Sequence, residues 1–279
     1  MQSHTASVTA KICAYLRGIE AGNSKKIFND YLAMDLLSKK ERADMSELTR
    51  EYQDTAALQA MTSVPLSRSA WAEGHLACFA QGRTHLQYLI LGAGLDTFAW
   101  RNRNSGIRVF EVDHPATQKD KKSRIQSLHW QSKAETFFTG VNFGRDDLNS
   151  RLLEDGFDPA LPTLISILGV SYYLPFAAFA DTLSSLSKLL RGPARVLFDY
   201  QHKDFDDFSG SRSLSAFTAL FGESMAAGYL PNEIFNLLEK LGWYHSEHLA
   251  PKDIEKRYFA SRHDGLHAFE SVHFLAAGR

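Results

Sequence analysis

The sequence contains only two cysteines, Cys13 and Cys78. Neither lies in a Cys-x-x-Cys or other metal-ligand spacing, so we predict no metal site and expect a reducing compartment. No stretch approaches the roughly 18 apolar residues that a membrane-spanning helix needs, and the N-terminus lacks the apolar core of a secretory signal. We therefore expect a cytoplasmic protein without a membrane partner.

An excess of charge is also missing, because the net charge is −1. The densest basic run, residues 119–124, includes Asp120 and is typical of the solvated face of a helix. The charge therefore gives no reason to expect nucleic acid as a partner. With 279 residues, 44% hydrophobic and 23% charged, the chain has the composition of one large globular domain or a domain with a cap. Nothing in the sequence indicates an oligomeric state.

A glycine turn directly after an apolar run is the most informative feature of the sequence. The run at 88–91 predicts a strand that is buried on both faces. Gly92 and Gly94 permit a tight turn where a ligand can approach the backbone, and a helix predicted from about Leu95 would direct its N–H groups at that ligand. About twenty residues further on, Asp113 ends a second predicted strand, where a carboxylate can bind ribose hydroxyls. This pattern predicts a site for a nucleoside cofactor.

The residues after the glycines favour one cofactor over another. A dinucleotide turn requires a third small residue where this chain has Thr97. Asp96 and Thr97 instead place a negative charge and a hydroxyl at the start of the helix, which suits a cationic ligand or simply caps the helix. S-adenosylmethionine carries a sulfonium and an amino group and no phosphate. The sequence therefore favours this cofactor over NAD, with a nicotinamide oxidoreductase as the weaker alternative.

From residue 87 onward, strand and helix patterns alternate, as in a parallel α/β sheet with helices on both faces. Strands are predicted over 87–92, 107–112, 135–141, 163–169, 194–200, 242–248 and 270–276. Helices are predicted over 95–103, 115–130, 146–154, 176–190 and 231–241. The last two strands pair, so we predict a seven-stranded sheet whose last strand is reversed.

The N-terminal part of the chain has few strand signals. Residues 1–75 are predicted to form a helical cap, with helices over 9–20, 27–37 and 43–52. This cap either covers the ligand site or serves as a purely structural layer. Residues 76–279 form the cofactor-binding domain, with an insertion at about 201–228 that is long for a plain connection.

Three other patterns could also belong to functional sites. Asp147, at a strand end and followed by Leu148, can accept from an adenine amino group while the backbone N–H of Leu148 donates to the ring; alternatively, Asp147 caps the next helix. His245 and His248 are predicted to lie on one strand and face opposite ways, which argues against a metal site. The run 169–173 lacks the second glycine of a nucleophile elbow.

The runs 89–97 and 110–118 together resemble the leucine carboxyl methyltransferase family. This family includes eukaryotic enzymes that methylate a protein C-terminal leucine and many bacterial O-methyltransferases of small molecules. The resemblance covers most of the chain and continues through 147–148, 156–158, 169–174, 198–200, 228–242 and 256–259. It implies a class I methyltransferase fold, which is Rossmann-like, with S-adenosyl-L-methionine as donor and S-adenosyl-L-homocysteine as product.

The resemblance also implies roles for individual residues. Gly92 and Gly94 match the turn at the methionine side of the cofactor, Asp113 the ribose carboxylate, and Asp147 with Leu148 the adenine contacts. Arg68 matches the arginine that pairs with the cofactor carboxylate. Without the resemblance, Arg68 would be interpreted as an exposed charge on a helix. The predicted cofactor-binding residues are Arg68, Gly92, Ala93, Gly94, Asp96, Asp113, His114, Asp147, Leu148 and Leu168.

Leu168 departs from the family, which usually has a glutamate at this position beside the cofactor. The chain has therefore either compensated elsewhere or altered the pose or affinity of the cofactor. A family member that binds the cofactor without catalysis is the alternative that this departure suggests.

The expected reaction is an in-line methyl transfer for which the protein aligns the acceptor and excludes water. A carboxylate acceptor is already ionised at neutral pH, so a methyl ester on a small molecule such as a secondary metabolite is the first expectation. A phenol or alcohol would need help with deprotonation, and Tyr172, Tyr173 and His202 are the candidates. Tyr173 matches a tyrosine that the family keeps near the acceptor, or it forms an aromatic lid.

Overall fold

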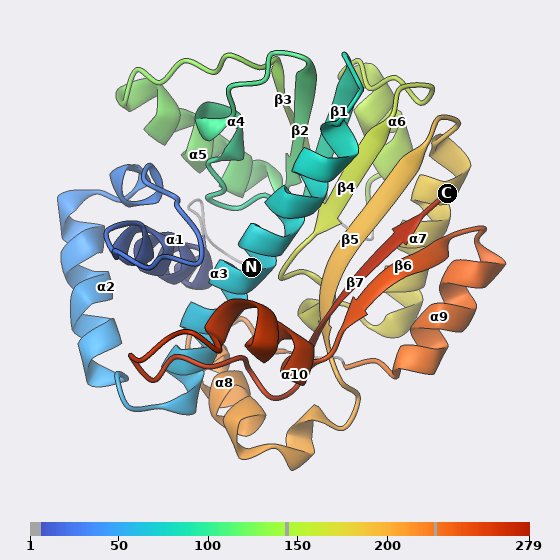
Figure 1. Cartoon of the computed structure of the whole chain (residues 1–279). Helices are drawn as coiled ribbons and strands as arrows, with labels where there is room; N and C mark the ends of the chain where they lie inside the picture. Colours follow the sequence, from blue (N-terminus) through green and yellow to red (C-terminus); the bar gives the residue numbers. More distant parts are fainter. Residues whose placement is uncertain (1–6, 143–144, 226–227) are drawn as a thin grey trace.

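The chain folds around a seven-stranded sheet with helices on both faces (Figure 1). The structure is a computed structural model and describes residues 7–142, 145–225 and 228–279. The strands, in the order β3-β2-β1-β4-β5-β7-β6, are β1 (Leu86–Leu91), β2 (Ile107–Asp113), β3 (Thr136–Gly140), β4 (Thr163–Ile167), β5 (Ala194–Gln201), β6 (Tyr244–Leu249) and β7 (Val272–Gly278). β7 is antiparallel to its two neighbours, and the pairs among β1 to β5 are parallel. The predicted α/β fold with a reversed last strand is confirmed.

The helices form two layers and an N-terminal group (Figure 1). They are α1 (Val8–Ala21), α2 (Lys39–Glu51), α3 (Ala56–Ala80), α4 (Phe98–Arg101), α5 (Pro115–Ser127), α6 (Leu148–Glu154), α7 (Phe176–Leu189), α8 (Ser209–Ala219), α9 (Pro231–Lys240) and α10 (Pro251–Ile254). Short 3-10 or π turns cover Ala33–Leu36, Ser171–Tyr173, Phe205–Asp207 and Glu255–Phe259. None of the described helices is long and apolar enough to cross a membrane.

Strand β1 is buried on both faces, as its continuous apolar sequence predicts. Tyr88 and Ile90 pack in the same cluster as Trp71 of α3. Leu89 and Leu91 point the other way, into the cluster that contains α7 and α9. Because β1 has β2 on one side and β4 on the other, the order of the sheet reverses here. In an open α/β sheet, a ligand binds at the carboxyl ends of the strands that flank such a point.

The N-terminal part differs in one helix from the prediction. The helix predicted over 27–37 is wrong, because only Ala33–Leu36 forms a 3-10 turn. Two side chains of this segment instead contact other parts of the chain. Phe28 packs against the guanidinium of Arg101, and Asp30 is buried in an ion pair with Arg17. The predicted end of the cap at residue 75 lies inside α3, which continues to Ala80.

Two further differences are local. The helix predicted over 95–103 is reduced to α4, because the Asp96 side chain caps the N–H of Phe98 and Asn102 starts a turn with Asn104. The insertion at about 201–228 contains α8, which packs on α3; its residues 226–227 lie outside the described residues.

The expectation that His245 and His248 face opposite ways is wrong. A β-bulge between His245 and Glu247 shifts the alternation of β6 by one residue. Both imidazole rings therefore pack against Phe235 of α9, with ring centroids at 4.9 Å and 5.3 Å. The His248 ring also stacks on the ring of His273 in β7 at 5.2 Å.

We expect the His273 imidazole to make the protein less stable in mild acid. Burial, and then the neighbouring His248 and His202, lowers the pKa of His273 from 6.5 to about 4, against a weaker opposite effect of Asp253. Between these values the unfolded chain binds the proton and the folded chain does not, so stability falls as the pH drops through this window. The loss from pH 7 to pH 5 should be about 2 kcal/mol. Urea unfolding at both pH values measures this loss.

The variant His273→Phe is the matched control, because it keeps the stacked ring and cannot titrate. Its unfolding free energy should change by about 2 kcal/mol less than that of the parent between pH 7 and pH 5. Equal pH dependence in the two proteins would contradict the assignment to His273.

Candidate cofactor and acceptor site

The predicted glycine turn lies at the carboxyl end of β1, where the sheet order reverses (Figure 1). Gly92 and Gly94 have φ values of +75° and +48°, which side chains other than glycine adopt at a cost. The N–H groups of Gly92 and Ala93 both donate to the carbonyl of Val112, at 2.8 Å and 3.1 Å. The turn is thereby fixed to the end of β2.

Gly92 also has no room for a side chain. A Cβ atom there would lie 2.4 Å from Cγ2 of Val170, whereas one on Gly94 would lie 3.7 Å from Cβ of Ala10, an ordinary contact. Gly92→Ala should therefore lower the unfolding free energy by about 2–3 kcal/mol through strain and overpacking. Gly94→Ala, which has the strain without the clash, should cost about 1 kcal/mol.

Urea unfolding of the two variants measures this difference. A second change, Val170→Ala, should recover part of the loss in Gly92→Ala and none in Gly94→Ala, because it removes the methyl group that clashes. Equal destabilisation of the two glycine variants would show that steric exclusion at Gly92 is unimportant.

Asp113 ends β2 beside the turn. One carboxylate oxygen accepts the N–H of Gly94 at 2.7 Å, and the other accepts the N–H of His114 at 2.6 Å. Burial raises the pKa of Asp113, and these two N–H groups oppose the increase. The side chain of Thr117 also hydrogen-bonds this carboxylate. Since the two oxygens have four lone pairs in all, one remains for a ribose hydroxyl. His114 itself is the N-cap of α5, where its Nδ1 accepts the N–H of Ala116 at 3.2 Å.

Asp96 and Thr97 have local partners in the structure. Asp96 accepts the N–H of Phe98 at 2.6 Å, which is a capping contact. Thr97 is fully buried and donates its hydroxyl to Asp30. Arg17 of α1 binds Asp30 at 2.9 Å and the carbonyl of Leu95 at 2.8 Å. Asp30 and Arg17, which were not among the predicted site residues, attach α1 to the glycine turn.

Asp147 and Leu148 begin α6. The exposed carboxylate of Asp147 accepts the N–H of Asn149 at 3.0 Å and the hydroxyl of Ser150 at 2.7 Å. The Ser150 hydrogen bond lowers the pKa of Asp147, and Leu148 is buried in the core. The capping role is therefore present in the structure, while the adenine contact stays a prediction.

Arg68 forms a buried ion pair that was not predicted. From the middle of α3 it donates to Asp199 of β5 at 2.9 Å. Asp199 is fully buried, and it also accepts the N–H of Gly169 at 2.7 Å and the hydroxyl of Tyr172. The Arg68 guanidinium lies against Gly169, since a Cβ atom there would be 2.5 Å from its Nη2 atom. Burial alone lowers the pKa of Arg68, but Asp199 raises it above its ordinary value.

The structure brings together Arg68 and the two predicted tyrosines, but not His202. Tyr173 follows Tyr172 after β4, with ring centroids 6.5 Å apart. Leu168 packs with the apolar cluster between α3 and the sheet. The ring of His202 instead packs on His273 at 5.9 Å, on the face of the sheet that α9 covers.

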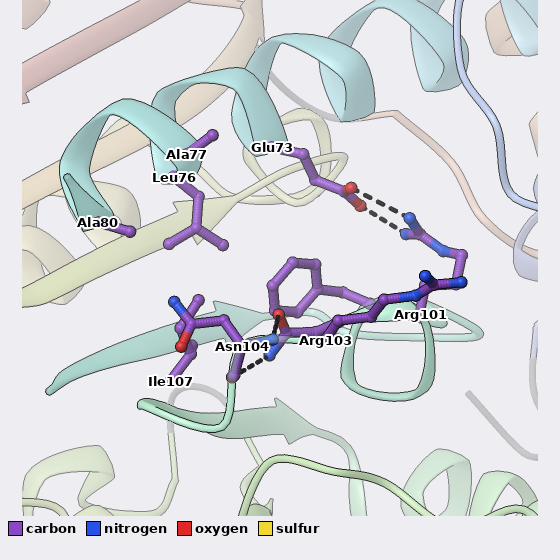
Figure 2. A pocket seen from close by; sticks show the side chains of 10 residues that line it. Glu73, Leu76, Ala77, Ala80, Arg101, Arg103, Asn104 and Ile107 are labelled. Atoms are coloured by element: carbon purple, nitrogen blue, oxygen red, sulfur yellow. Dashed lines mark hydrogen bonds and ion pairs between the residues drawn. The ribbon is translucent and has the colours of Figure 1, made fainter. Parts of the chain in front are cut away.

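A surface hollow of about 480 Å³ lies between α3 and α4 (Figure 2). Figure 2 shows the bidentate pair of Glu73 and Arg101 beside it, and Leu76 and Ala80 of α3 facing it. Among the described residues, its lining includes none of those predicted to bind the cofactor. The candidate site lies instead at the carboxyl ends of the central strands, where α1 covers the glycine turn.

The reversed last strand, the glycine turn after β1 and the carboxylate at the end of β2 define the fold of the class I methyltransferases. The model of the leucine carboxyl methyltransferase family matches residues 10–187. The chain belongs to this family.

Individual relatives agree with this assignment. YktD of Bacillus subtilis (strain 168), named as an S-adenosyl-L-methionine-dependent methyltransferase, is 31% identical over 99% of both chains. A DUF574 family protein from Streptomyces avermitilis has the same fold, with a TM-score of 0.61 at 15% identity over 95% of each chain. Magnesium protoporphyrin IX methyltransferase from Synechocystis, solved with bound S-adenosylhomocysteine, has a TM-score of 0.51 at 14% identity over 85% of this chain and 94% of its own. The cofactor is S-adenosylmethionine, as predicted.

Proposed function

We propose that the protein is an O-methyltransferase that forms a methyl ester on the carboxylate of a small molecule. The observation that carries this proposal is the state of the two tyrosines after β4. Tyr172 donates its hydroxyl to Asp199, and burial followed by the Asp199 charge raises the pKa of Tyr172 well above its ordinary value. Burial, followed by the charge of Glu223, also raises the pKa of Tyr173. Neither phenol is therefore suited to act as a base.

This state favours an acceptor that is ionised before it binds. A carboxylate has a pKa near 4 and is ionised at neutral pH, whereas a phenol near 10 would need a base. When bound, the cofactor supplies a methyl group on a positively charged sulfur. The chain then has to align the acceptor and exclude water, and α1, which is attached to the glycine turn by Arg17 and the carbonyl of Leu95, suits the second task.

Matched acceptors test the proposal. The protein is incubated with methyl-labelled S-adenosylmethionine and with pairs such as an aromatic acid and the corresponding benzylic alcohol or phenol. A methyl ester releases labelled methanol in mild base, and an ether does not. We expect base-labile label on acids only, and none with the Asp113→Ala variant.

Base-stable label on phenols or alcohols would overturn the carboxylate assignment. Calorimetric binding of S-adenosylhomocysteine without transfer to any acceptor would instead indicate a binding protein without catalysis, the alternative that Leu168 suggested.

A further inference from the structure

The methionine end of S-adenosylmethionine carries a carboxylate and an ammonium group, so a site for it needs a cation and an anion. Arg68 is the predicted cation, at the carboxyl ends of β4 and β5. Leu168, just after the end of β4, is apolar and packs in the core. We infer that Glu223, from the segment after α8, binds the ammonium group of the cofactor.

Glu223 reaches the site through the helix that covers it. Its carboxylate accepts the hydroxyl of Thr9 in the first turn of α1. The next residue, Ala10, is the one that contacts the glycine turn, because its Cβ lies 3.7 Å from the position of a Cβ on Gly94. The hydrogen bond to Thr9 therefore attaches the carboxylate to the helix that contacts the turn, although Glu223 and Thr9 are 214 positions apart in the chain.

The charges of Glu223 and Arg68 both act on the thiol of Cys13. Cys13 lies on α1 one turn after Thr9, and burial is the main cause that raises the pKa of its thiol. Arg68 lowers the pKa of this thiol, and Glu223 raises it. A cation and an anion thus lie near one place under α1, as the two charges of an α-amino acid require.

Asp199 is less suited to this role than Glu223. It already accepts hydrogen bonds from Arg68, from the N–H of Gly169 and from the hydroxyl of Tyr172, and it is fully buried. Glu223 is only partly buried and, within the described part of the chain, accepts a hydrogen bond from Thr9. Its remaining lone pairs are available to the three hydrogens of an ammonium group.

Two ligands that differ only in the ammonium group test the inference. One is S-adenosylhomocysteine, and the other is its analogue with hydrogen in place of the amino group. Calorimetry is done with the full chain and with Glu223→Gln. We expect this variant to bind S-adenosylhomocysteine about 10- to 100-fold more weakly, the effect of losing a charged hydrogen bond. Its affinity for the deaminated analogue should change less than about twofold. Glu223→Asp, which keeps the charge, should lie between the two proteins.

Thr9→Val distinguishes binding from a purely structural role. This variant removes the hydrogen bond that orients Glu223 but keeps the carboxylate, so it should weaken S-adenosylhomocysteine less than Glu223→Gln does. Equal losses for both ligands in Glu223→Gln, or no loss for either, would overturn the inference. The inference rests on the cofactor and not on the proposed acceptor, so the methyl ester assay can fail while this test succeeds.

Discussion

Replacing Asp199 with alanine is expected to lower the free energy of unfolding by about 4 kcal/mol, the effect of breaking a buried ion pair. The change would leave the Arg68 guanidinium buried without its anion, and it would also remove the acceptor for the N–H of Gly169 and the hydroxyl of Tyr172. Asp199 itself is fully buried, so water cannot replace it without rearrangement. Urea unfolding measures the loss.

A double replacement separates the cost of an unpaired charge from the contribution of the pair. Arg68→Met with Asp199→Leu removes both charges and should recover most of the stability that Asp199→Ala loses, because apolar residues can replace a buried ion pair. Asp204→Ala, on the exposed turn after β5, should change the unfolding free energy by less than about 0.5 kcal/mol. A loss below about 1 kcal/mol in Asp199→Ala would show that Arg68 finds another partner.

The fold was predictable because its signals are local. The central strand β1 is a short apolar run that is buried along its whole length. The site residues that depend on one turn were also found: Gly92 and Gly94 need positive φ values, and Asp113 lies across the turn from Gly94, 19 residues away. Residues whose backbone conformation fixes their identity can be identified from the sequence alone.

The side-chain pairs that were missed join residues that are far apart in the chain. Arg68 and Asp199 are 131 positions apart, and Asp30 and Thr97 are 67 apart. A sequence pattern does not show which of its charged residues will meet in space. Asp199 did carry one signal, because it lies between Phe198 and Tyr200 in a strand with an otherwise apolar core. A charge within such a strand requires a buried partner.

Two predictions were wrong for the same physical reason: the helix over 27–37 and the opposite orientation of His245 and His248. The periodicity of 27–37 is helical, but the contacts of Phe28 and Asp30 with the domain favour another backbone path. The alternation over His245 and His248 fails because one residue is added in the bulge. In both segments tertiary contacts outweigh the local preference, which differs by less than about 1 kcal/mol per residue.

Replacing Asp113 with alanine is expected to weaken the binding of S-adenosylhomocysteine by about 10- to 100-fold. Asp113 is the predicted ribose carboxylate. The N–H groups of Gly94 and His114 and the side chain of Thr117 bond to it, which leaves one lone pair for a ribose hydroxyl. Each hydrogen bond from a ribose hydroxyl to a charged group contributes about 1.5–3 kcal/mol. Calorimetry measures the loss, with Asp181→Ala, exposed on α7 at the other face of the sheet, as the control that should bind normally.

The same variant also loses the acceptor that fixes Gly94, so a weaker affinity could arise from a distorted turn. The 2′-deoxy analogue of S-adenosylhomocysteine separates the two causes, because it lacks one hydroxyl. The parent protein should bind this analogue about 10-fold more weakly than S-adenosylhomocysteine, and Asp113→Ala should bind the two ligands equally. If the variant still discriminates between them as the parent does, the hydroxyl binds elsewhere, and Asp113 acts only through the glycine turn.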